Sequence, residues 1–160
     1  MLAAAGRCEE SIAATEKAFE LDPNPTHVSM LRSNLEYCFE RQGKTKEAFE
    51  EELKVRAAQG ASTAKIEELK RVFARSGLKG VWEKDIQEKV AGWNANPLHT
   101  RAFDIAWLYA KVGQYDQAFA WIDRCIELRS TVVIWMYPGS SPFYGNLRIA
   151  EYKRKMGLQR

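Results

Sequence analysis

The sequence predicts an all-α fold, an α-hairpin repeat solenoid, and three observations lead to this prediction. Glycines that each separate two helix-forming stretches recur at intervals of 37, 34 and 36 residues, at Gly6, Gly43, Gly77 and Gly113. Apolar residues between these glycines recur at the spacing of one helix face. No stretch of β-branched residues alternates convincingly with polar ones, which argues against half-buried strands. Two helices in each period of about 34 residues are typical of a repeated hairpin.

The period divides the chain into about four units and a closing segment. The units are predicted near residues 1–25, 26–60, 61–97 and 98–130, with the closing segment at 131–160. The first unit lacks most of its first helix, so we expect the chain to begin inside a repeat. An apolar run at Thr131–Tyr137 could be a strand or a short buried helix. We favour the helix because the chain offers no second strand.

The helices are expected to bury one face and expose charge on the other. In the fourth unit Ala102, Ile105, Ala106, Tyr109 and Ala110 share one face. Ala106 and Ala118 are predicted to be small because neighbouring helices approach there. Acidic and basic residues four apart are interpreted as a solvated face, in the pairs Glu50–Lys54, Glu52–Arg56 and Glu67–Arg71.

Composition limits the class of partner. The 160 residues are 46% hydrophobic and 28% charged, which is too apolar for a disordered chain. No uncharged apolar run approaches the roughly 18 residues of a membrane-spanning helix. A net charge of +3 does not by itself indicate nucleic-acid binding. We therefore expect a single soluble domain over 1–160 with neither a membrane nor a nucleic-acid partner.

The cysteines and the N-terminus favour a reducing compartment. Cys8, Cys38 and Cys125 are odd in number and none are closely spaced, so neither a disulfide framework nor a Cys-x-x-Cys site is expected. Each lies among apolar residues and is interpreted as a small buried hydrophobe. The first residues lack the basic leader and apolar core of a secretion signal. We expect a cytoplasmic location.

Catalytic and metal-binding patterns are absent from the sequence. Its two histidines, His27 and His99, each follow a proline by two residues, a position typical of a helix's first turn. Phosphate-binding glycine loops and a Gly-x-Ser-x-Gly elbow do not occur. Four tryptophans lie 14 residues apart, and Trp121 and Trp135 are interpreted as packing residues. We expect no catalytic residues, no metal, no cofactor and no enzyme activity.

The fourth unit resembles a known repeat. It reads Ala102-x2-Ile105-Ala106-x2-Tyr109-x3-Gly113-x-Tyr115-x2-Ala118-x3-Ile122-x2-Cys125. This pattern resembles the tetratricopeptide repeat. The Leu21-Asp22-Pro23-Asn24 ending of the first unit is typical of that family, and the second unit matches at Leu35, Phe39, Gly43 and Ala48. The third unit keeps Leu69, Phe73 and Gly77 but has Trp82 where a small residue is expected. We expect that bulky side chain to splay the two helices of this unit.

The C-terminal segment is similar to a recurring ending of bacterial tetratricopeptide domains. The similarity lies in Tyr137-Pro138-Gly139-Ser140-Ser141-Pro142-Phe143 and in Lys155-Met156-Gly157-Leu158. Such endings occur at the C-termini of multidomain regulators, among them winged-helix activators, Ser/Thr kinases and cyclases. The resemblance implies that the chain is the C-terminal part of such a protein, or a free-standing relative. It also implies a closing helix near 146–157.

The resemblance further implies a right-handed superhelix whose first helices line a concave groove. Carrying the family's groove positions onto this chain selects Ser33, Asn34, Tyr37 and Arg41, then Arg71 and Arg75, then Phe103, Asp104, Trp107 and Lys111. Alternatively, Phe103 and Trp107 pack on the closing helix. A clamp for a C-terminal carboxylate is not expected, because Glu68 falls where a cation is required. The expected function is binding of a partner protein's peptide or helix. The alternative is a regulatory, sensor or self-association domain.

Overall fold

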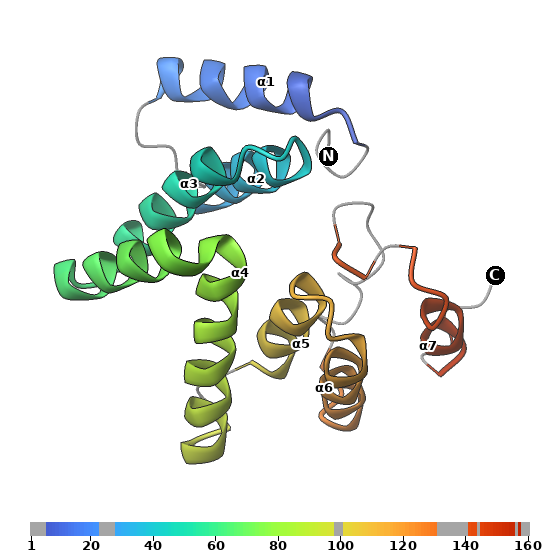
Figure 1. Cartoon of the computed structure of the whole chain (residues 1–160). Coiled ribbons are helices and arrows are strands. Elements are labelled where there is room, and N and C mark those ends of the chain that lie inside the picture. The colour runs from blue at the N-terminus through green and yellow to red at the C-terminus, as the bar shows by residue number, and fades with distance from the viewer. Residues whose placement is uncertain are drawn as a thin grey trace. The chain divides into compact units, whose positions relative to one another are not determined.

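The computed structural model describes residues 6–22, 28–97, 101–130, 141–143, 145–155 and 157. Within these ranges the chain forms α-helices and no strand, which confirms the all-α prediction (Figure 1). The predicted short helix at 131–137 lies outside the described residues. The chain divides into two compact units, Met1–Gly80 and Val81–Arg160, and each is described by itself.

The first unit is built from α1 (Cys8–Leu21), α2 (Val28–Arg41), α3 (Thr45–Ala58) and the first part of α4 (Thr63–Ala95). Helix α2 packs against both α1 and α3. Leu35 and Ala48, which matched the repeat pattern, are both buried between these helices. The rings of Phe49 and Phe73 stack with centroids 4.0 Å apart and join α3 to α4. Apolar residues at helical spacing thus form this core, as the sequence predicted.

One charged face is less exposed than predicted. Glu51 on α3 is buried, with its carboxylate 3.0 Å from Arg32 Nη1 and 2.5 Å from Lys54 Nζ. Lys54 therefore pairs with Glu51 three residues away, and not with Glu50. The predicted Glu52–Arg56 pair does form, at 2.6 Å. A buried carboxylate without a cation is strongly destabilising. The pairing with Arg32 and Lys54 therefore allows Glu51 to lie in the packed interior and not only on a charged face.

The recurring glycines end helices. Gly113 has a φ of 80°, a left-handed conformation in which a side chain would be strained. The turn lets the Gln114 N–H donate to the Tyr109 carbonyl at 2.9 Å, which satisfies an otherwise unpaired group at the end of the helix. Lys44 donates to Phe39 in the same way after Gly43. The period found in the sequence therefore marks hairpin turns.

Gly77 divides the span labelled α4 into two helices. Its φ of 61° and ψ of −164° are not helical, although helical geometry resumes directly afterwards. The helix boundary predicted at Gly77 is thus present as a local break. Residues of α4 up to Gly80 belong to the first unit, and those from Val81 belong to the second. The splaying predicted from Trp82 stays a prediction.

The second unit contains the rest of α4 with α5 (Ala102–Lys111), α6 (Tyr115–Glu127) and α7 (Ile149–Lys155). Ala106 and Ala118 are fully buried in its core, which confirms them as packing positions. Trp121 is buried, as predicted, and its ring meets Trp93 of α4 edge to face with centroids 5.3 Å apart. Trp135 lies outside the described residues.

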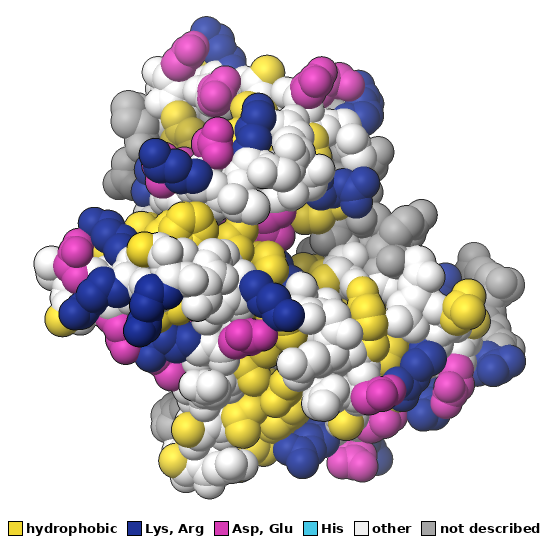
Figure 2. Space-filling model, in the orientation of Figure 1, with side chains coloured by type: hydrophobic (Ala, Val, Ile, Leu, Met, Phe, Trp, Pro, Cys, Tyr) yellow, Lys and Arg dark blue, Asp and Glu magenta, His cyan; other side chains and the backbone are white. Residues whose placement is uncertain are grey.

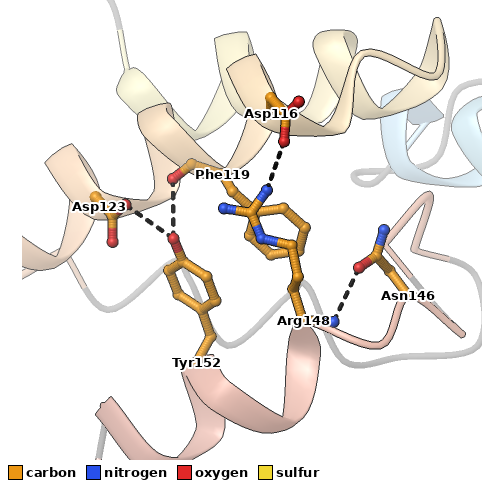
Figure 3. A network of polar contacts seen from close by, with 6 residues as sticks. All are labelled: Asp116, Phe119, Asp123, Asn146, Arg148 and Tyr152. Carbon is orange, nitrogen blue, oxygen red and sulfur yellow. Dashed lines mark hydrogen bonds and ion pairs between the residues drawn. The ribbon is translucent and has the colours of Figure 1, made fainter.

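The described part of the closing segment packs on α6 (Figure 3). Phe119 is fully buried, and the rings of Tyr152 and Phe143 lie 4.8 Å and 5.6 Å from it. The Tyr152 hydroxyl lies 2.8 Å from Asp123 Oδ2 and 3.3 Å from the Phe119 carbonyl oxygen, both acceptors. Burial, followed by the hydrogen bond to Asp123, raises the pKa of Tyr152 to about 12. The hydroxyl therefore stays protonated. Helix α7 lies within residues 146–157, where the sequence predicted a closing helix.

Replacing Ala118 with Leu is expected to lower the free energy of unfolding by about 1–3 kcal/mol, because extra methylenes overpack a fully buried site. The measurement is urea denaturation followed by circular dichroism. Ala120, two residues further along α6, is exposed and provides the matched control. Equal denaturation midpoints for Ala118→Leu and Ala120→Leu would contradict the packing assignment.

Candidate partner-binding surface

Helix α5 separates its apolar residues from a partly exposed face. Ile105, Ala106 and Ala110 are buried. Asp104, Trp107 and Lys111 remain partly exposed, and we call these three residues the α5 face. Their spacing of three and four residues places them along one side of a helix. Asp104 in the first turn and Lys111 in the last also suit the helix dipole.

The two aromatic residues predicted on α5 have different surroundings. Phe103 is 8% exposed and belongs to the core of the second unit. Trp107 packs against that core but keeps part of its ring at the surface. The two ring centroids are 5.8 Å apart. Phe103 therefore packs against Trp107 from the core side. Of the two rings, that of Trp107 is the more exposed and belongs to the α5 face.

Two residues of α4 that the groove prediction missed contribute to the α5 face. The Lys111 ammonium lies 4.7 Å from the centre of the Trp82 ring, a cation–π contact. Asp104 lies 3.2 Å from Arg101 and 3.9 Å from Lys89. Figure 2 shows hydrophobic side chains reaching the surface over the second half of α4 and α5. The signal in the sequence was Trp82 itself, a large residue at a small position.

In the first unit the predicted residues of α2 form a polar line. Ser33 and Arg41 are exposed, whereas Asn34 and Tyr37 are half-buried. Tyr37 packs against the buried cysteines of α1 and α2. Burial raises the pKa of Tyr37, and the hydrogen bond with Arg41 opposes that shift. This line offers hydroxyl, amide and guanidinium groups to a partner.

Arg71 and Arg75 are exposed one turn apart on α4. Arg71 Nε donates to the Glu67 backbone carbonyl at 3.3 Å, and the Glu67 carboxylate pairs instead with Lys70 at 2.8 Å. The predicted ion pair between Glu67 and Arg71 therefore does not form, and Lys70 takes the place of Arg71 beside the Glu67 carboxylate. Among the described residues, neither Arg71 nor Arg75 has a carboxylate partner. By contrast, Lys65 lies 3.4 Å from Glu68.

Helical hairpins closed by left-handed turns, together with a partly exposed first helix, define the chain as an α-helical repeat protein. In a comparison with protein families, residues 102–131 match the tetratricopeptide repeat. The match covers α5 and α6 and confirms the resemblance read in the fourth unit. Tetratricopeptide repeats are in general protein–protein interaction modules. No significant match was found among curated proteins or among solved structures.

Metal-binding clusters and membrane-spanning helices are both absent from the described ranges. These ranges contain no group of three or more His, Cys, Asp or Glu residues suited to a metal ion. His27 and His99 lie outside the described residues. No described helix combines the length and the apolar character needed to cross a bilayer. The cysteines are all free and buried, which confirms their interpretation as small interior residues.

Proposed function

We propose that the chain binds an acidic, partly apolar segment of a partner protein on the first helices of its repeats. The observation that carries this proposal is the α5 face. Within the matched repeat, the first helix buries Ile105, Ala106 and Ala110 and leaves Trp107 partly exposed between Asp104 and Lys111. Tryptophan is among the residue types that contribute most to protein interfaces. Because the Phe103 ring already packs against Trp107, the Trp107 side chain loses less conformational entropy when a partner binds.

The acidic character of the partner follows from Arg71 and Arg75. Guanidinium groups bind carboxylates through two parallel hydrogen bonds, and this pair has no such partner among the described side chains. Residues four apart on a helix share a face, so both can meet one segment. Tyr37 and Arg41 extend the offered chemistry along α2. The guanidinium and aromatic groups together favour a partner segment that carries Asp or Glu beside an aromatic or aliphatic residue.

Arg71→Glu combined with Arg75→Glu is expected to weaken partner binding at least tenfold, which corresponds to about 1.4 kcal/mol. Peptides would be selected from a random phage-displayed library on the immobilised chain and then titrated by fluorescence anisotropy. Selected peptides should be rich in Asp and Glu. Trp107→Ala tests the α5 face separately and should weaken the peptides that bind there by a similar factor, because it removes the exposed aromatic group.

The matched control is Lys17→Glu combined with Lys46→Glu, which makes the same change of charge at two exposed positions of the first unit. This control should bind as tightly as the unchanged chain. Circular dichroism checks that each variant is folded. Folded Arg71/Arg75 and Trp107 variants with unchanged affinity would rule out these faces as the binding surface. Sedimentation of the unliganded chain tests the self-association alternative.

A further inference from the structure

Two cysteines far apart in sequence meet in the first unit. Cys8 is the first residue of α1, and Cys38 lies in the last turn of α2. The packing of α1 on α2 places both in one buried cluster, against which Ile12 and Tyr37 pack. The Cys8 thiol is also among the groups that raise the pKa of Cys38. Sequence spacing gave no sign of this pair, because the contact arises only when the helices pair.

One thiol of the pair borders a cleft. The start of α1 and the end of α2 line a cleft of about 340 Å³, and Cys8 and Arg41 form part of its wall. Cys8 is 8% exposed, whereas Cys38 is fully buried behind it. A small molecule in the cleft would therefore reach Cys8 first.

We infer that Cys8 and Cys38 form a dithiol site, which a small-molecule disulfide converts into an intramolecular disulfide linking α1 to α2. The Cys8 thiolate attacks one sulfur of the incoming disulfide, forms a mixed disulfide and releases the first thiol. The Cys38 thiol then loses its proton to solvent, and its sulfur attacks Cys8 Sγ and releases the second thiol. Two electrons pass from the cysteine pair to the oxidant, which leaves as two thiols.

Burial makes the two thiol–disulfide exchange steps differ in rate. The pKa of Cys38 is raised to about 12, first by burial and then by the hydrogen bond with Cys8. Burial is the largest cause of this shift and remains after Cys8 has reacted, so it still disfavours the Cys38 thiolate; the second step is therefore the slower one and the mixed disulfide accumulates transiently. The product closes a loop between α1 and α2 and restricts the unfolded chain, so oxidation should raise the melting temperature.

Cys125 is the internal control. It is 1% exposed in the core of the second unit, where no other described cysteine lies, and burial raises its pKa to about 11. It has no thiol partner in the described part of the chain. Under the same oxidant Cys125 should remain a free thiol.

The experiment incubates the folded chain with excess glutathione disulfide and follows its intact mass and its tryptic peptides. The expected product lacks two hydrogen atoms, contains a peptide joining Cys8 to Cys38, keeps Cys125 free and reverts with dithiothreitol. Cys38→Ser should stop at one glutathione on Cys8, and Cys8→Ser should leave Cys38 unreacted. Circular dichroism before oxidation checks that each variant is folded.

The unchanged chain alone can decide the question, so the proposal does not depend on the variants folding. A folded chain that keeps all three thiols until it is denatured would overturn it. A chain that carries separate glutathiones on Cys8 and Cys38, or that joins either to Cys125, would overturn it equally. Loss of two hydrogen atoms without a higher melting temperature would contradict the predicted link between α1 and α2.

Discussion

Phe119→Ala is expected to lower the free energy of unfolding by about 3–5 kcal/mol. Phe119 is fully buried at the centre of the contacts between α6 and the closing segment. Its ring meets Phe143 and Tyr152, and the Arg148 guanidinium lies 4.3 Å from the ring centre. Truncation leaves a cavity that three neighbours must border. Urea denaturation followed by tryptophan fluorescence measures the loss.

The same substitution should loosen α7, because its aromatic anchor loses its partner. Limited proteolysis is expected to cleave the Phe119→Ala variant after the basic residues of α7 faster than it cleaves the unchanged chain. Leu147→Ala is the control, because Leu147 is 93% exposed. That change should stay within about 0.5 kcal/mol. Similar losses for both variants would show that the closing segment does not pack on α6.

Features set by local periodicity could be predicted from the sequence. The glycine period located turns because a left-handed residue ends several of the helices, as at Gly43 and Gly113. Ala106 and Ala118 could be recognised as close-approach positions because small residues recur there in a helical-repeat pattern. These signals lie within a few residues of the feature that they predict.

Features set by contacts between helices could not be predicted. A solvated face was expected around Glu50–Lys54, yet Glu51 is buried because Arg32, 19 residues earlier, reaches it from α2. The resemblance to the tetratricopeptide repeat placed both Phe103 and Trp107 in the groove, with packing on the closing helix as the alternative. Only the packing of α4 and α6 around α5 determines that Phe103 is in the core while Trp107 remains partly exposed. The Cys8–Cys38 contact escaped sequence reasoning for the same reason.

Phe49→Ala should have a comparable effect in the first unit, with an expected loss of about 3–5 kcal/mol. Phe49 is 4% exposed and stacks on Phe73 with an angle of 3° between the rings. This stack is the aromatic contact that joins α3 to α4. The measurement is urea denaturation of Phe49→Ala, Phe73→Ala and the double variant, followed by circular dichroism.

The double variant separates the stack from simple burial. If the rings stabilise each other, the double variant should be more stable than the sum of the single losses predicts, by about 0.5–1.5 kcal/mol. Leu21→Ala provides the control, because Leu21 is 78% exposed at the end of α1 and should change little. Strictly additive losses would mean that each ring is held by its other neighbours. The attachment of α3 to α4 would then depend on the aliphatic residues around the stack, among which Leu69 is fully buried.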